Sequence, residues 1–135
     1  MNRSKRKSLR ILVAESHVGA AGPAVNELRR RGHDVVSCAP PPGSSAPCVG
    51  LSPDGSCPLD EPVDVVVDVH TDASARIQMG ELPAVCAMRR EVPVIAVGPP
   101  DMTATITWAS RRCTIADAPD ACEEIGRICQ TRDIR

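Results

Sequence analysis

Short apolar runs alternate with amphipathic stretches along most of this chain, and the pattern predicts an alternation of strands and helices. The apolar runs are nearly unbroken in Val, Ile, Leu and Ala, as is typical of strands buried on both faces of a sheet. Strands are predicted at 9–14, 33–38, 63–69, 92–98 and 112–116. Helices are predicted at 23–31, 74–90, 101–110 and 119–130, from apolar positions at helical spacing and from Pro or Asp at a helix start.

This alternation indicates an α/β fold, a doubly wound three-layer sandwich with a five-stranded parallel sheet and right-handed crossovers. The second crossover is the exception, because residues 39–62 hold seven prolines and three glycines. No helix tolerates that density of proline, so we expect an irregular loop, rich in proline and cysteine, to replace the helix. The domain is expected to span 9–130, with a basic, flexible leader at 1–8 and a tail at 131–135.

Composition narrows the class of protein. The chain has 135 residues, enough for one compact domain, and a formal net charge of −1. Its one aromatic residue is Trp108, so it has no platform on which bases could stack, and nucleic-acid contact is expected at most from the basic leader. No apolar run approaches the ~18 residues of a membrane span. The seven cysteines are odd in number and dispersed, and no signal peptide follows the basic start, so we expect a cytoplasmic protein with reduced thiols.

Acidic residues stand at the ends of two predicted strands. Glu15 follows the first strand, and Asp68 and Asp72 lie around the end of the third. Because the carboxyl ends of parallel strands meet at one edge of a sheet, we expect these residues to form an acidic rim there. Carboxylate oxygens are suitable ligands for Mg²⁺. The alternative is that they only cap loops and solvate the rim, since spacing alone does not identify metal ligands.

Over about 9–130 the chain resembles the receiver domain of two-component response regulators. The likeness rests on an opening strand with an acid after it, on the turn 31–36, and on the strands 64–68 and 92–95. The resemblance implies a five-stranded, flavodoxin-like sandwich that takes a phosphoryl group on an aspartate at the end of the third strand. It also implies an acidic pair that binds metal, a Ser or Thr, and a lysine beside that aspartate.

The chain departs from the receiver pattern at the positions that carry the chemistry. Counting from Asp64, the phosphoacceptor position falls on Val69, and only a shift of one residue places Asp68 there. The hydroxyl position is Gly98 and the lysine position is Ala118, and no basic nitrogen from another segment is expected at Asp68. Without these groups a phosphoryl group has little to hold it. We therefore predict a pseudo-receiver, a non-enzymatic signalling or regulatory domain that contacts a protein partner and is not phosphorylated in the usual way.

A second hypothesis is a thiol- or metal-based sensor. Cys38, Cys48 and Cys57 lie in or beside the irregular segment, where thiolates could hold zinc or an iron–sulfur cluster. The paired CxxC spacing of structural zinc sites is absent. A redox pair of Cys48 with Cys57, or three inert thiols, are the other interpretations.

A third hypothesis is a small dinucleotide-binding domain. Gly19 and Gly22, followed by a predicted helix, are similar to part of the glycine motif of short-chain, epimerase-like proteins, in which the backbone approaches a pyrophosphate. The first glycine position of that motif is Ser16, and no acid for a ribose follows the second strand. No nucleophile elbow occurs, and Ser16 and His17, as neighbours in sequence, are not expected to face each other. We therefore expect no enzyme.

Overall fold

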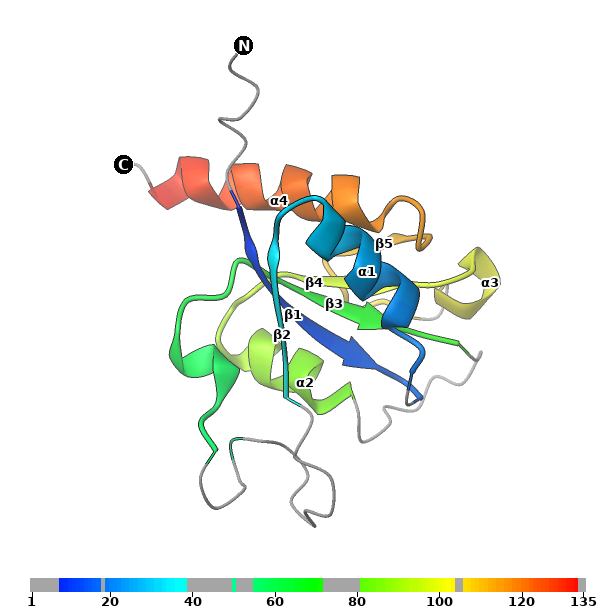
Figure 1. The fold of residues 1–135 in the computed structure, drawn as a ribbon, viewed down its shortest axis with the longest axis horizontal. Helices are drawn as coiled ribbons and strands as arrows, with labels where there is room; N and C mark the ends of the chain where they lie inside the picture. Colours follow the sequence, from blue (N-terminus) through cyan, green and yellow to red (C-terminus); the bar gives the residue numbers. More distant parts are fainter. Residues whose placement is uncertain are drawn as a thin grey trace.

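The computed structural model describes residues 8–17, 19–38, 50, 55–71, 81–103 and 106–133. These residues build a five-stranded, all-parallel sheet in the order β2-β1-β3-β4-β5 (Figure 1). The strands are β1 (Arg10–Glu15), β2 (Asp34–Ser37), β3 (Val65–Val69), β4 (Val94–Val97) and β5 (Arg111–Cys113). The helices are α1 (Gly22–Arg30), the 3-10 turn η3 (Pro58–Asp60), α2 (Leu82–Arg89), α3 (Pro100–Thr103) and α4 (Ala118–Asp133).

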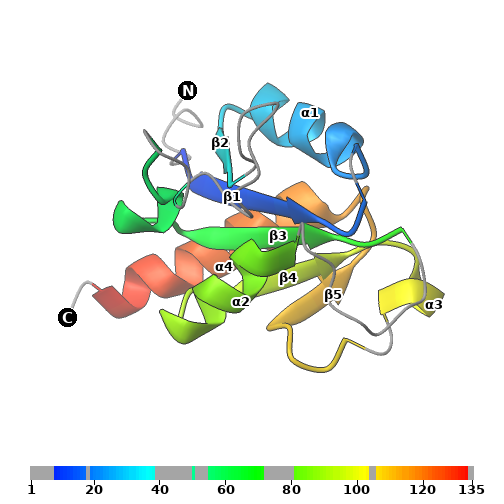
Figure 2. The same ribbon diagram turned by 90° about the horizontal axis from the view of Figure 1, so that it is seen from below.

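Helices cover both faces of the sheet. Helices α1 and α4 contact each other and pack on one face, and α2 packs on the other face against β1, β3 and β4 (Figure 2). The short helix α3 lies beside β5 at the sheet's edge. The three layers and the strand order confirm the predicted doubly wound α/β sandwich.

The alternation of side chains along the strands fills both layers of the core. Ile11 of β1 and Val65 and Val67 of β3 join the apolar cluster beneath α1 and α4. Leu12 and Val66 join the cluster on the α2 face. Because neighbouring residues of a strand point to opposite faces, one step along β3 decides in which layer a side chain is buried. This alternation between the two faces determines which functional side chains can contact each other.

Several element boundaries differ from the predictions. Strand β5 ends at Cys113, because the residues after it turn directly into α4. Helix α3 ends at Thr103 and contains Asp101 within it, so the helix predicted at 101–110 is wrong over most of its length among the described residues. Of the helix predicted at 74–90, the described part begins at Leu82, with Pro83 in the first turn where its missing N–H costs nothing. Helix α4 continues past the boundary expected at 130.

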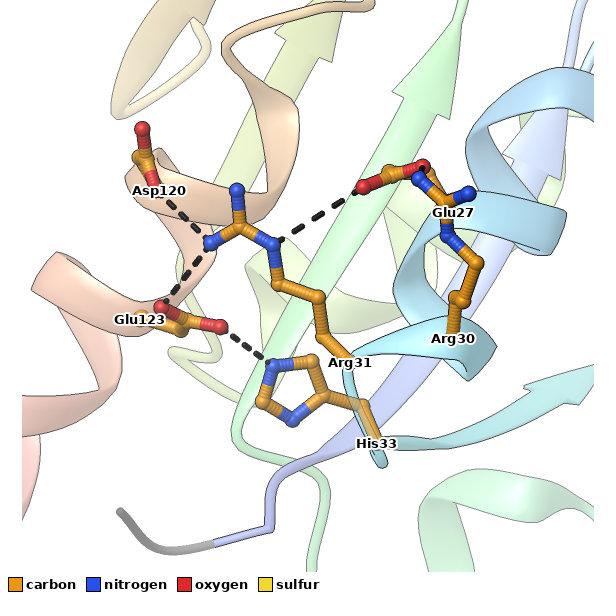
Figure 3. Close-up of polar contacts among 6 residues, drawn as sticks. All are labelled: Glu27, Arg30, Arg31, His33, Asp120 and Glu123. Atoms are coloured by element: carbon orange, nitrogen blue, oxygen red, sulfur yellow. Dashed lines mark hydrogen bonds and ion pairs between the residues drawn. The ribbon is translucent and has the colours of Figure 1, made fainter. Parts of the chain in front are cut away.

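A polar link, buried at His33 and Glu123, joins the turn after α1 to α4 (Figure 3). The His33 Nδ1 accepts the Leu9 N–H at 3.1 Å, which leaves the ring proton on Nε2, and this nitrogen donates to Glu123 Oε2 at 2.8 Å. Arg31 donates to Asp120 at 2.8 Å and to Glu123 at 3.3 Å. Glu123, only 7% exposed, therefore binds both His33 and Arg31, and the link holds α4 against the start of β1.

Residues 58–62, which lead from the proline-rich segment into β3, are hydrogen-bonded to an arginine of β1 and to the arginine that follows α2. Arg10 donates to the Pro58 and Pro62 carbonyls at 2.9 and 3.3 Å, and Arg90 donates to the Leu59 carbonyl at 2.6 Å. The Leu59 side chain is buried in the cluster on the α2 face. Of the predicted irregular loop, residues 39–49 and 51–54 lie outside the described residues. None of the helices in the described ranges has the length and apolar character needed to cross a lipid bilayer.

Candidate functional site

The carboxyl ends of four strands lie in register at one edge of the sheet, where doubly wound folds place their working groups. Glu15 of β1 pairs with Val69 of β3, Val69 pairs with Val97 of β4, and Val97 pairs with Cys113 of β5. Residues in register share a face, so the side chain of β3 that accompanies Glu15 is that of Val69. Asp68 instead pairs with Ala14 and cannot replace Val69 without a slip of the whole strand.

The structure does not bring Glu15 and Asp68 together at a common rim, because the two side chains point to opposite faces of the sheet. Glu15 lies on the α1 face, where its Oε1 accepts the Ala21 N–H at 2.9 Å at the start of α1. Asp68 is fully buried on the α2 face. Asp72 lies outside the described residues. The carboxylate of Glu15 therefore stabilises a helix N-terminus, a role that suits its charge.

The positions of the receiver hydroxyl and lysine carry no such groups. Gly98 follows β4, and a Cβ added there would lie 2.6 Å from the His70 carbonyl oxygen, so the backbone leaves no room for a side chain. Ala118, the predicted lysine position, is buried at the first residue of α4. Because β5 is short, the residue directly after it is Thr114, whose hydroxyl donates to Asp117 at 3.2 Å.

A small polar cluster lies where β1 and β3 end. Ser16 Oγ is 3.3 Å from His17 Nδ1, and Thr71 Oγ1 is 3.0 Å from the same nitrogen. The Thr71 N–H donates to Ser16 Oγ at 3.1 Å. The expectation that Ser16 and His17 do not face each other is wrong, because the chain bends after β1 and turns both side chains toward Thr71. The cluster links the two strand ends across the edge.

The second polar cluster is buried on the α2 face and consists of Asp68, His70 and Glu81. The His70 Nε2 lies 3.1 Å from Asp68 Oδ2 and 3.1 Å from Glu81 Oε1. The exposed fractions of Asp68, His70 and Glu81 are 0%, 4% and 1%. A basic nitrogen therefore does lie beside Asp68, although it comes from the same segment.

Part of this cluster can be predicted from the sequence. Asp68 and His70 are two residues apart at the end of a strand, which places them on one face. Glu81 was missed, because it comes from the turn before α2, and no spacing rule connects it to β3.

A cavity of about 590 Å³ lies beside β4 and β5. Its lining includes Arg111, Arg112, Cys113, Asp117 and Glu124. The hydrogen bond to Glu124 raises the pKa of the Arg111 guanidinium, so Arg111 stays charged. Burial, and then the Asp117 carboxylate, raise the pKa of the Cys113 thiol. A thiol with a raised pKa is a poor nucleophile. The cavity therefore offers no activated nucleophile at Cys113.

The cysteines predicted as metal ligands are only partly described. Cys38 is buried in the apolar cluster on the α2 face, and Cys57 packs against that cluster. The Cys57 thiol is free. Cys48 lies outside the described residues, so a metal site or a redox pair in this segment stays a prediction.

The glycines predicted to approach a dinucleotide lie before and at the start of α1. Gly19 has a φ of +91°, a conformation that favours glycine, and Gly22 is the first residue of the helix. The Glu15 carboxylate already accepts an N–H at this helix terminus. A pyrophosphate bound there would meet a like charge, and the dinucleotide site stays a prediction.

The strand order and the layers define a flavodoxin-like α/β domain with the architecture of a receiver. The crystal structure of NtrX from Brucella abortus has this fold, with a TM-score of 0.56 at 14% sequence identity over 96% of this chain. The chain spans 30% of the length of that NtrX chain. Comparison of the sequence with family models and with curated proteins finds no match.

Proposed function

We propose that this chain is a receiver-like regulatory domain that acts by contacting another protein and is not phosphorylated in the usual way. The observation that carries the proposal is the pairing of Glu15 with Val69, which puts an apolar side chain in the register of the phosphoacceptor. The fold it shares with NtrX, a response regulator, supports the regulatory role.

The groups at the carboxyl edge argue against phosphoryl transfer. A phosphoryl acceptor of the receiver type is a carboxylate that the donor can reach, with a cation and a hydroxyl to hold the transferred oxygens. Val69 has no oxygen, Asp68 is fully buried on the other face, and Glu15 is engaged with α1. Gly98 leaves no room for a hydroxyl-bearing side chain. A signal that passes through this domain therefore depends on binding and not on a phosphoaspartate.

Intact-mass spectrometry of the full chain after incubation with acetyl phosphate and Mg²⁺ tests the proposal. We expect no adduct of about 80 Da, the mass that one phosphoryl group adds. A receiver domain that accepts phosphate, treated in parallel, is the positive control. An adduct that persists through the separation and disappears in Asp68→Asn or Glu15→Gln would overturn the proposal and would identify the acceptor.

The contact with a protein partner is tested separately. A partner recovered by cross-linking in the native cell is expected to bind the purified chain with the same affinity before and after treatment with acetyl phosphate and Mg²⁺. A change in affinity that follows the treatment would contradict a phosphorylation-independent mode of action.

A further inference from the structure

We propose that Asp68, His70 and Glu81 form a binding site for one divalent transition-metal cation of the Zn²⁺ class. The site does not rest on the proposed function. It lies on the α2 face of β3, whereas Glu15 and Val69, the paired receiver positions of β1 and β3, lie on the α1 face.

The geometry of the three side chains converges on one point. The His70 Nε2 is 3.1 Å from one oxygen of each carboxylate, and one donor atom from each residue lies within 4.8 Å of the other two. Two donors bound to one tetrahedral Zn²⁺ at 2.0–2.2 Å are about 3.3 Å apart. The nitrogen therefore already stands from each carboxylate oxygen at about the separation found between ligands of one cation.

The charges of the cluster call for a cation. The Asp68 and Glu81 carboxylates, with exposed fractions of 0% and 1%, both lie beside the His70 imidazole, and its one Nε2–H can point at only one of these two oxygens. Among the described residues, Asp68 Oδ1 has no hydrogen-bond partner, although it is fully buried. An unpaired oxygen of a buried carboxylate is costly. A divalent cation balances two carboxylates and a neutral imidazole, and it can take up this oxygen as well.

The ligand set selects the kind of metal. Imidazole nitrogen suits Zn²⁺, Fe²⁺ and similar ions, and carboxylates are accepted by the same ions. Mg²⁺ and Ca²⁺ prefer sites built from oxygen alone, and Cu⁺ prefers sulfur ligands. Three protein ligands leave a fourth position for water or a further ligand.

A bound cation would join two elements that are separated along the chain. Asp68 and His70 belong to β3 and the residue after it, and Glu81 stands immediately before α2. Metal occupancy would thus fix the start of α2 against the end of β3 and would raise the stability of that contact.

The test is a titration of the metal-free, reduced full chain with Co²⁺, a probe for Zn²⁺ whose visible spectrum reports its ligands. We expect binding of one equivalent, with d–d bands, no thiolate-to-cobalt charge-transfer band, and displacement by Zn²⁺. Glu81→Gln and His70→Gln are expected to weaken binding by at least about tenfold. The matched control is Glu15→Gln, the same change at the end of β1 on the opposite face, which should leave the affinity unchanged.

Three results would overturn the metal site: no saturable binding of Co²⁺ to the wild-type chain, a thiolate charge-transfer band, or unchanged affinity in both variants. Circular dichroism checks that the variants fold. If one variant does not fold, the affinity of the other variant and the spectrum of the wild-type chain still test the metal site. The first result would identify the cluster as a hydrogen-bonded network that holds α2 without a metal. Whether or not the chain binds Co²⁺, the result of the acetyl phosphate experiment is unaffected, so the metal site and the proposed function can fail independently.

Discussion

Replacing Gly98 by alanine tests whether the His70 carbonyl lies too close to Gly98 for any side chain, including a hydroxyl-bearing one, to fit at this position. The added Cβ would lie 2.6 Å from the His70 carbonyl oxygen and 3.4 Å from Thr103 Cγ2. The backbone on both sides is held, because the Gly98 N–H donates to the Cys113 carbonyl at 3.0 Å and the His70 N–H donates to the Val97 carbonyl at 2.8 Å. The contact therefore cannot be relieved by a side-chain rotation and requires a shift of a strand end.

The expected cost follows from two opposing effects. Overpacking in a well-packed interior costs about 1–3 kcal/mol, and a clash with a fixed backbone carbonyl belongs near the upper end. Alanine also restricts the unfolded chain, which stabilises the fold by about 0.4–1 kcal/mol. We expect the Gly98→Ala variant to lose about 2 kcal/mol in the free energy of unfolding.

Urea denaturation followed by circular dichroism measures this loss as a lower midpoint with an unchanged slope. The matched control is Gly22→Ala, because no heavy atom lies within 4 Å of a Cβ added there and the residue has no positive φ. That variant is expected to match the wild type or to exceed its stability by up to about 1 kcal/mol. A Gly98→Ala midpoint equal to the wild-type midpoint would refute the argument that a serine hydroxyl cannot be restored at this position.

Two further substitutions probe the polar contacts, and the reactivity and titration of one thiol probe the core. Glu15→Ala should lower the free energy of unfolding by about 1 kcal/mol through loss of the acceptor at the start of α1, and an unchanged urea midpoint would contradict this role. Glu123→Ala should cost about 1–3 kcal/mol because the buried His33 Nε2–H loses its partner, which a urea titration checks against the isosteric Glu123→Gln. Burial raises the pKa of Cys122 to about 12, so at pH 8 iodoacetamide should modify the exposed Cys86 well before Cys122, and rapid native labelling of Cys122 in a peptide map would count against the packing of α4. Because this pKa lies above the unfolded value of 9.0, the protonated thiol's contribution to stability should be intact below pH 9 and lost between pH 9 and about 12.

The fold was predictable because β1, β3 and β4 are mostly apolar runs, separated by helix and turn signals. Proline at the start of α1 and glycine after its end also marked that helix, and Gly32 has the positive φ expected at such a terminus. Turn chemistry near the end of the chain was not predictable in the same way. Asp101 suggested a helix cap, but it lies inside the short helix α3, where tertiary packing outweighs local preference.

The site was harder to predict, because it depends on register. The sequence puts Glu15, Asp68 and His70 at strand ends, yet only the pairing of β1 with β3 decides which of them share a face. A single residue of offset separates a common acidic rim from two carboxylates on opposite faces. Glu81 adds a contact between a strand and a distant helix start, and such a contact is specified by the packing of α2 and not by any local spacing.

The hydrogen bonds that hold η3 to the sheet and to α2 bear on how far the connection before η3 can vary in length. Arg10 and Arg90 hold the backbone of Pro58 and Leu59, so the entry into β3 is fixed independently of the chain that comes before it. The entropy of closing a loop rises only slowly with its length, by about 0.6 kcal/mol for each doubling. Loop closure alone therefore sets only a small penalty on shortening or lengthening the proline-rich connection, which makes it the natural place in this domain for a change of chain length.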